Sequence, residues 1–444
     1  MCSNTEIEDG AMLMEALDKF DLTGSLCKKC GNENKPQIVL RKKDAYCKSC
    51  FLTSVKHKFR ACLGKSKKMK PGDKVLVAFS GSSNSVAMLH LIQSGLQETS
   101  HKRLMFHPTI VYIDEYSALN LSEEESKTIK EDIQRTWGLY EYPKHIVPLH
   151  LSIEEEETVN AFLTKGTSTD KTKFINMFTS LPENTSKIDM LNKLRSNLLA
   201  QIARLLGCNK IFTAETANDL AVKLITNVSL GRGAQLPYDV GFSDDRYAEV
   251  KVIRPMRDLS KKELVFYNVF HDLIPAHVPS LLTKAEPHSS IHRLTESFLT
   301  DLQDGFPSTL STVFRVADKL TTNPEDKIIC PLCQAPVDTD KVPSSSLSAT
   351  QFSRIVSHAG PSKLDASSLE ATCNLGSEQC CNGGGDQSCR NKASEPSLQN
   401  LLCYGCNLIV RNADVAKFPN EVKRSLQEAS QRFQMRKEIE HFLL

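Results

Sequence analysis

The chain has 444 residues, of which 40% are hydrophobic and 24% are charged, and its formal net charge at pH 7 is +2. This composition is typical of a globular protein that can bury a large core and divide into two or three domains. No signal-type segment follows Met1 and no apolar run approaches membrane length, which argues against secretion and membrane insertion. Eight of the fifteen cysteines form C-x-x-C pairs, so we expect a cytoplasmic protein with thiolate metal sites.

The first such pairs are Cys27 with Cys30 and, sixteen residues later, Cys47 with Cys50. This spacing is typical of a zinc ribbon, in which four thiolates hold one structural ion. Gly31 supplies the permissive backbone that the first turn needs. A redox role is disfavoured because no βαβ pattern surrounds either pair.

A strongly basic stretch borders the first cysteine pairs. Residues 41–74 hold twelve Lys or Arg against two acidic residues, and Tyr46, Phe51 and Phe59 interleave with them. Such a stretch predicts salt-sensitive contacts with nucleic-acid phosphates, although a solvated basic linker would have the same composition. The candidate RNA-binding residues are Lys56, Lys58, Arg60, Lys65, Lys67, Lys68 and Lys70. The acidic residues of 121–157 are typical of a solvated face.

Apolar runs and helical patterns alternate through the middle of the chain. This alternation predicts a parallel α/β sheet, with ligands bound at the carboxyl ends of the strands. A Ser/Gly-rich loop, Ser80–Ser85, joins the first predicted strand to a helix, which is an arrangement that attracts an anion. The predicted strands are 74–79, 109–114, 145–149, 210–213 and 250–254, and the predicted helices between them are 86–96, 123–137, 187–206 and 217–229.

Two further C-x-x-C pairs lie near the end of the chain. Cys330 with Cys333 and Cys403 with Cys406 are separated by sixty-nine residues, which is far outside the usual zinc-ribbon spacing. The intervening residues 342–398 are rich in Ser, Gly and Asn, and they predict a disordered insertion. Because loop-closure cost grows only logarithmically with length, a split zinc ribbon with a second structural zinc remains feasible.

Several segments together resemble the tRNA thiouridylases of the PP-loop ATPase superfamily. The loop Ser80–Ser85 is similar to the S-G-G-x-D-S pyrophosphate loop, and Lys210–Asp219 is similar to a K-I-x-T-G-H-N-A-D-D segment. Arg254–Arg257 with Lys262-Glu263 resembles a P-L-x-x…K-E segment. The pattern is most similar to the cytosolic thiouridylase subunit 2 family, from about residue 27 to residue 277 and again at the last cysteine pairs. The resemblance implies a PP-loop fold (adenine nucleotide alpha hydrolase-like) flanked by N- and C-terminal zinc ribbons.

The nucleotide-binding residues implied by this resemblance are partly replaced. Asn84 stands in place of an Asp, Ser82 in place of the second Gly, and Asn218 in place of one Asp of the D-D pair. An amide is a weaker Mg²⁺ ligand than a carboxylate, so we expect ATP and Mg²⁺ to bind poorly. The sulfur-handling cysteines of the active relatives are missing, and we assign no catalytic residue. The degenerate nucleotide-binding set is Ser80, Gly81, Ser82, Ser85, Asp114 and Asp219.

The resemblance also implies a function and partners. The chain is expected to be a non-catalytic subunit of a tRNA sulfurtransferase that thiolates the wobble uridine, position 34, of tRNA for Lys, Glu and Gln. Its expected partners are the cytosolic thiouridylase subunit 1, in a heterodimer, a ubiquitin-like thiocarboxylate sulfur carrier and tRNA. The alternatives are a thiouridylase that is catalytic in its own right, and a zinc-ribbon scaffold that only binds tRNA.

These observations predict the following domain organisation. The segments are an N-terminal tail (1–23), a zinc ribbon (24–52), a basic linker (53–73), a degenerate PP-loop domain (74–280), a helical segment (281–329), a split zinc ribbon (330–341 plus 399–412) around the disordered insertion (342–398), and a C-terminal helix (413–444).

Overall fold

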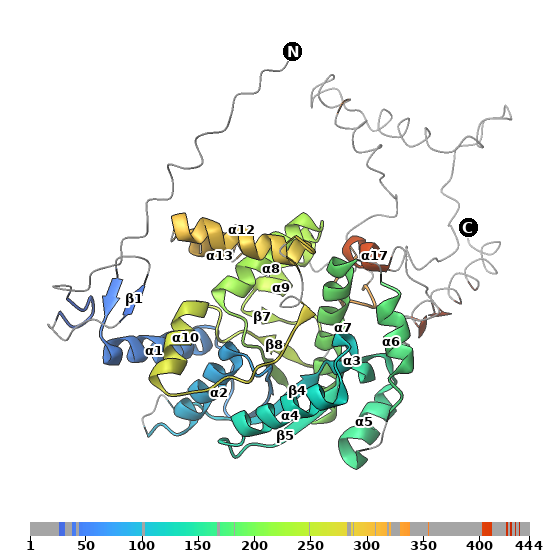
Figure 1. The fold of residues 1–444 in the computed structure, drawn as a ribbon, viewed down its shortest axis with the longest axis horizontal. Helices are drawn as coiled ribbons and strands as arrows, with labels where there is room; N and C mark the ends of the chain where they lie inside the picture. The colour runs from blue at the N-terminus through green and yellow to red at the C-terminus, as the bar shows by residue number, and fades with distance from the viewer. Residues whose placement is uncertain are drawn as a thin grey trace.

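A computed structural model gives the arrangement of most of the chain (Figure 1). It describes residues 26–31, 38–40, 44–99, 103–166, 169–181, 183–247, 249–281, 286, 288–306, 308–317, 319–320, 329–337 and 402–410, with isolated residues at 354, 423–424, 427–428, 431 and 435. The predicted tail, almost all of the predicted disordered insertion and most of the predicted C-terminal helix lie outside these residues, as do the cysteines of that insertion.

A six-stranded sheet in the order β5-β4-β3-β6-β8-β7 forms the centre of the fold. Five strands are parallel, and the two-residue β7 pairs antiparallel with β8 at the edge. The five predicted strands are confirmed, and their ends differ from the prediction by at most three residues. The strands are β3 (Asp73–Ala78), β4 (Phe106–Asp114), β5 (Lys144–Pro148), β6 (Lys210–Phe212), β7 (Ser243–Asp244) and β8 (Lys251–Ile253).

Side chains alternate across this sheet and bury one core on each face. Val75 and Val77 of β3 pack on the face covered by α1, α2, α4 and α10, whereas Leu76 packs on the opposite face against α7. The covering helices are α1 (Lys48–Lys65), α2 (Ser83–Leu96), α4 (Glu123–Trp137), α7 (Asn184–Leu205) and α10 (Lys261–Phe270). Helices α2, α4 and α7, together with α8 (Ala217–Ser229), confirm the four helices predicted between the strands. The fold has the three-layer α/β architecture expected of a parallel sheet.

Shorter elements complete the molecule around the sheet. The described residues between β5 and α7 include the short helices η1, α5 and α6, and Phe174, Met177 and Phe178 bury one side of α6. The described part of the predicted helical segment, residues 281–329, contains the helices α12 and α13. The remaining elements are β1 (Ile38–Leu40), β2 (Asp44–Tyr46), α3 (Tyr116–Leu119), η1 (Leu149–Ile153), α5 (Glu156–Lys165), α6 (Thr172–Thr179), α8 (Ala217–Ser229), η2 (Gly233–Gln235), α9 (Leu236–Val240), α12 (Ile291–Gly305), α13 (Thr309–Ala317) and α17 (Tyr404–Val410).

The prediction of a basic linker at residues 53–73 is wrong for the first part of this segment, which is helical. These residues continue α1, which begins at Lys48 and ends at Lys65. Phe51, Val55 and Phe59 lie on one side of this helix and are buried against the core. Because both phenylalanine rings are inside the protein, they are not available for contact with nucleic acid.

Candidate functional site

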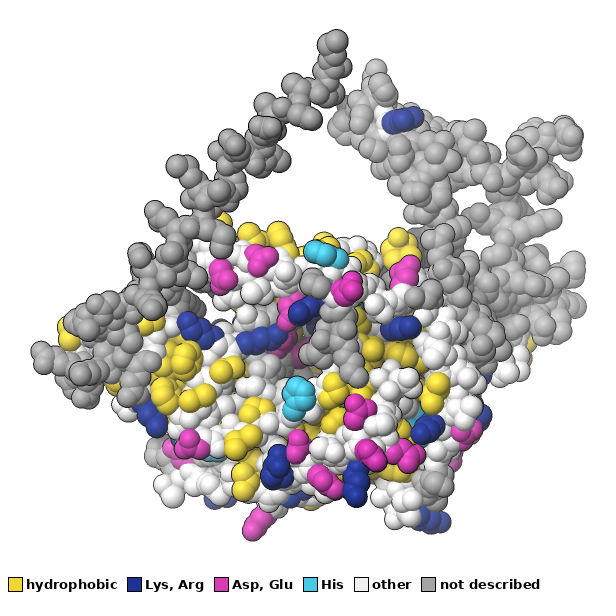
Figure 2. All heavy atoms as spheres, viewed as in Figure 1, with side chains coloured by type: hydrophobic (Ala, Val, Ile, Leu, Met, Phe, Trp, Pro, Cys, Tyr) yellow, Lys and Arg dark blue, Asp and Glu magenta, His cyan; other side chains and the backbone are white. Residues whose placement is uncertain are grey.

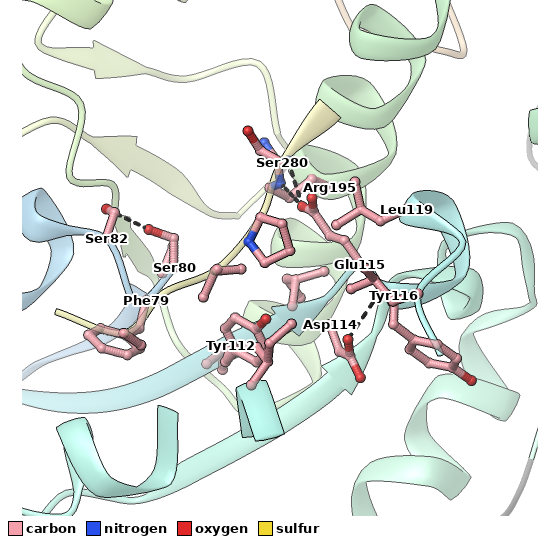
Figure 3. A pocket seen from close by; sticks show the side chains of 18 of the residues that line it. Phe79, Ser80, Ser82, Tyr112, Asp114, Glu115, Tyr116, Leu119, Arg195 and Ser280 are labelled. Atoms are coloured by element: carbon pink, nitrogen blue, oxygen red, sulfur yellow. Dashed lines mark hydrogen bonds and ion pairs between the residues drawn. The ribbon is translucent and has the colours of Figure 1, made fainter. Parts of the chain in front are cut away.

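A cleft opens at the carboxyl ends of β3 and β4 (Figure 3), on one side of the point between β3 and β6 where the strand order of the sheet reverses. Its volume is about 410 Å³, and most of its lining is apolar. The polar lining is divided between two sides: the hydroxyls of Ser80 and Ser82 lie on one, and Glu115 with Arg195 lies on the other. The region outside the carboxyl ends of the strands is the usual ligand position in an open parallel α/β sheet.

The loop that follows β3 is held by its own hydroxyl groups. The Oγ of Ser80 lies 2.9 Å from the Oγ of Ser82 and donates to the Oγ of Ser85 at 3.3 Å. Gly81 has φ +76°, and an added Cβ there would lie 2.5 Å from Cδ1 of Ile133. The loop therefore requires glycine at this position. Ala276 closes over it by donating its backbone N–H to the Gly81 carbonyl at 2.9 Å.

Asn84 lies in the first turn of α2 and Asp219 in the first turn of α8, and the two side chains meet directly. Asn84 Nδ2 donates to Asp219 Oδ2 at 3.1 Å. The same oxygen accepts from the backbone N–H and the hydroxyl of Thr216, which caps α8, at 3.0 and 2.7 Å. The other oxygen, Oδ1, lies 3.0 Å from Nζ of Lys261. Both oxygens of Asp219 thus have partners from the protein, and a cation at this carboxylate would have to displace Lys261 or break the cap.

The carboxylates at the end of β4 are also neutralised. Asp114 Oδ2 lies 2.8 Å from Lys130 Nζ, and Asp114 Oδ1 accepts from the backbone N–H of Tyr116 at 3.2 Å. Glu115 Oε1 accepts from Nε of Arg195 at 2.5 Å, as Figure 3 shows. Of the six predicted nucleotide-binding residues, Ser80, Ser82 and Asp114 line the cleft, whereas Asp219 is linked to the loop only through Asn84. No local sequence pattern indicated that Lys130, Arg195 and Lys261 would be their partners.

The first cysteine centre forms where the sequence predicts it. The sulfurs of Cys27, Cys30, Cys47 and Cys50 all lie within 4.8 Å of one another, beside the hairpin of β1 and β2 and the start of α1. Burial raises the pKa of the Cys27 thiol, but backbone N–H groups, with that of Cys47 first, outweigh it and lower the pKa to about 6. These donors favour the thiolate, which is the form that binds a metal ion.

The second cysteine centre assembles from the two distant pairs. Cys330, Cys333, Cys403 and Cys406 are all buried, their sulfurs lie within 4.8 Å of one another, and Cys333 Sγ is 3.6 Å from Cys403 Sγ. A tetrahedral zinc ion with four bonds of about 2.3 Å places its sulfurs about 3.8 Å apart, so this geometry fits a zinc ion. The four residues belong to the core that covers one face of the sheet.

Polar side chains from the sheet domain surround this second centre. Gln235 Nε2 lies 2.9 Å from Cys403 Sγ, Arg232 donates to the Gly405 carbonyl at 3.3 Å, and Asn197 donates to the Leu332 carbonyl at 3.1 Å. Arg232 also donates to Asp189 at 2.6 Å, and both side chains are almost fully buried. The centre is therefore built into the domain, and the split ribbon is not an independent unit. Sequence spacing gave no indication of these partners.

The seven predicted RNA-binding residues separate into two groups. Lys58, Arg60 and Lys68 form ion pairs with Glu263, Glu98 and Asp245, respectively. The remaining four, Lys56, Lys65, Lys67 and Lys70, have no ion pair within the part of the chain that the structure describes. The face drawn in Figure 2 carries acidic and basic side chains intermixed, so its described residues do not form a field of one sign. None of the described helices combines the length and apolar content needed to span a bilayer.

The similarities to known proteins are extensive. A family described as Cytoplasmic tRNA 2-thiolation protein 2 matches residues 290–408. Cytoplasmic tRNA 2-thiolation protein 2-A of Xenopus laevis is 36% identical, over 95% of this chain and 94% of its own length. The corresponding proteins of Danio rerio and Homo sapiens are 35% and 33% identical, covering 94% and 87% of this chain and 94% and 86% of their own lengths.

Among solved structures, the U34-tRNA thiolase NcsA from Methanococcus maripaludis with its [4Fe-4S] cluster is similar to this chain. Its TM-score is 0.49 and its sequence identity is 16%, with 72% of this chain and 94% of that chain covered. The relatives named above exceed 30% identity over nearly the whole chain, so the chain belongs to the cytoplasmic tRNA 2-thiolation protein 2 family.

Proposed function

We propose that this chain is a subunit of a cytoplasmic tRNA sulfurtransferase complex needed for 2-thiolation of the wobble uridine, position 34, in tRNA for Lys, Glu and Gln. The observation that carries this proposal is the similarity to 2-thiolation proteins along 95% of the chain. The subunit binds tRNA and leaves the chemistry to its partner. That partner is the cytosolic thiouridylase subunit 1, which would keep intact ATP and sulfur sites.

The division of labour follows from the chemistry of the reaction. Replacing the oxygen at C2 of uridine requires activation by adenylation and then attack by sulfur, here supplied by a ubiquitin-like thiocarboxylate carrier. Adenylation uses ATP with a hard cation, which needs free carboxylate oxygens. In this chain Asn84 has replaced one carboxylate, and Asp219 is already bound to Thr216 and Lys261. These contacts support a non-catalytic role for the cleft.

The two cysteine centres are proposed to hold structural zinc. In each centre four thiolates would complete the tetrahedral shell of the ion, leaving no open position for a substrate. Bound there, zinc would crosslink distant parts of the chain. In the second centre it would join Cys330 and Cys333 to Cys403 and Cys406 across sixty-nine residues.

Nucleoside mass spectrometry of tRNA from cells lacking this protein tests the proposed function. We expect 2-thiouridine derivatives at position 34 to disappear while the modification at carbon 5 remains, because the two positions are modified by different chemistry. Re-expression of the wild-type chain is expected to restore the thiolated nucleoside. Persistence of 2-thiouridine in the deletion cells would refute the proposal.

A second prediction concerns the nucleotide. Calorimetric titration of the isolated full chain with ATP and Mg²⁺ is expected to show only weak binding, with no detectable hydrolysis, because Asp219 lacks a free oxygen for the cation. Asp219→Asn retains a cap oxygen for α8 and Ser80→Ala removes a loop hydroxyl, so neither variant is expected to change the titration. Tight, Mg²⁺-dependent binding that either variant abolishes would instead support a chain that is catalytic in its own right.

A further inference from the structure

A second large groove lies at the opposite ends of the strands from the cleft. Its volume is about 720 Å³. One part of its lining comes from α1 and the end of α2, and the other from residues 67–71, which precede β3, and residues 103–106, which lead into β4. The groove therefore borders the amino ends of β3 and β4, whereas the cleft borders their carboxyl ends. Since β3 has six residues, the two are separated by roughly 20 Å along the strand.

The groove is strongly basic. Five Lys or Arg side chains line it, and its single carboxylate, Glu98, is paired with one of them, Arg60. Lys67, Lys70 and Arg103 are exposed, and they come from the two segments that precede β3 and β4. No carboxylate among the described residues pairs with these three. The complete set of cations is Lys56, Arg60, Lys67, Lys70 and Arg103, accompanied by the imidazole of His57.

The segment that carries Lys67 and Lys70 is held in place by the buried carboxylate of Asp73. Asp73 Oδ2 accepts from the backbone N–H of Lys70 at 2.7 Å and lies 2.9 Å from Lys210 Nζ, while Oδ1 accepts from Asn209 at 2.8 Å. Asp73 is only 6% exposed. These contacts fix the backbone, so the lysine side chains project from a rigid rim. Binding to such a site orders fewer groups than binding to a flexible basic tail.

We infer that this groove binds the sugar–phosphate backbone of RNA. A phosphate ladder needs several cations spaced along a channel, and lysine and arginine side chains on both walls supply them. The uncharged part of the lining includes the apolar side chains of Met69, Leu104 and Met105 and the hydroxyls of Thr53 and Ser94. The ring of Phe106 is buried, whereas the imidazole of His57 is exposed. With no exposed Phe, Tyr or Trp ring in its lining, the groove offers bases only the imidazole of His57 for stacking, so it is suited mainly to backbone contacts that do not depend on sequence.

This inference rests on the proposed function, because it takes the tRNA of the 2-thiolation reaction as the ligand. It also makes that function more specific. Of the seven RNA-binding residues predicted from the sequence, three do not line the groove, and a fourth, Arg60, lines it but is paired with Glu98. Arg103 and His57, which the sequence did not single out, also line the groove. Because the groove lies away from the cleft, RNA would be held without contact to the degenerate nucleotide-binding loop.

Equilibrium binding of a tRNA transcript to the full chain, measured over a range of KCl concentrations, tests the inference. The triple variant Lys67→Gln, Lys70→Gln and Arg103→Gln is expected to bind at least tenfold more weakly at low salt. The slope of log affinity against log salt should fall by roughly one for each lost phosphate contact. A matched control removes three exposed charges outside the groove, by Lys127→Gln, Lys165→Gln and Lys173→Gln, and should bind almost as the wild type does.

Three results would overturn the inference. The first is an unchanged salt slope in the triple variant of the groove, and the second is an equal loss of tRNA affinity in the triple control variant. The third is a triple groove variant that loses binding to anionic vesicles or to a poly-glutamate peptide but keeps its binding to tRNA. Ser80→Ala, which changes the cleft, is expected to leave tRNA affinity unchanged, and a comparable loss in that variant would also count against a separate groove. The proposed function is tested independently by the deletion cells. If the groove variants bind tRNA normally but the deletion cells lack 2-thiouridine, only the RNA-binding role of the groove is refuted. If 2-thiouridine persists in the deletion cells, the proposed function itself is refuted.

Discussion

Replacing Cys406 with serine is expected to release the metal of the second cysteine centre and to destabilise the domain strongly. Cys406 is fully buried, and its three companion ligands are at most 4% exposed. A structural zinc site contributes its binding free energy, roughly 10 kcal/mol or more in small zinc domains, to the folded state. Without the ion, the remaining thiolates would be like charges inside a core, which is costly. Loss of even half of that contribution would lower Tm by roughly 10 °C or more.

Metal analysis and thermal unfolding of the purified chain check this expectation. The wild type is expected to hold close to two equivalents of zinc, and Cys406→Ser close to one. Cys30→Ser should also lose one equivalent but with a smaller fall in Tm, because Cys30 is exposed and its centre lies beside a two-stranded hairpin. Cys208→Ser removes a buried thiol that belongs to neither centre, and it should retain both ions. Two equivalents in Cys406→Ser would refute the second zinc site.

Local sequence patterns were sufficient to predict the sheet and the cysteine centres. The strands were found because five short apolar runs alternate with helical patterns, and this period depends only on neighbouring residues. The C-x-x-C pairs were found because each pair must form one tight turn, whatever the length of chain between pairs. The pairing of Cys330 with Cys403 could be proposed without knowing what filled the gap.

Contacts between distant residues could not be predicted in the same way. The sequence showed that Asn84 had replaced a carboxylate, but not that its amide would donate to Asp219, which is 135 residues away. It also could not show that Lys261 would satisfy the other oxygen of Asp219. Composition identified a basic stretch correctly. Composition could not reveal that Lys58 and Lys68 would be neutralised by Glu263 and Asp245, since those acids come from other elements.

The last prediction concerns Arg232, which lies beneath the second cysteine centre. Its guanidinium donates to Asp189 at 2.6 Å, and the two side chains are 2% and 5% exposed. Burial raises the pKa of Asp189, but His292 and Arg232 outweigh it and lower the pKa to about 2. Because this folded pKa is below the unfolded value of about 3.9, the contribution of Asp189 to stability is complete above pH 4 and is lost as the pH falls towards 2.

Arg232→Met leaves Asp189 as a buried charge with His292 Nε2, at 3.1 Å, as its remaining partner. The expected loss is about 3–5 kcal/mol at pH 8, measured as the shift in the urea unfolding curve. The loss should be smaller at pH 5.5, because burial without the guanidinium raises the pKa of Asp189 and favours its neutral form there. The contribution of the wild-type ion pair to stability should vary little between pH 5.5 and 8, because this range lies above both the folded and the unfolded pKa of Asp189.

The double variant Asp189→Asn with Arg232→Met separates the charge from the packing. It removes both charges while keeping a side chain of similar size at residue 189, so it should be more stable than Arg232→Met alone at pH 8. Its difference from the wild type should also be nearly independent of pH between 5.5 and 8, because Asp189 no longer titrates. If the double variant is as unstable as Arg232→Met at both pH values, the guanidinium acts through its bonds to Gly405 and Asn227 instead of through the charge of Asp189.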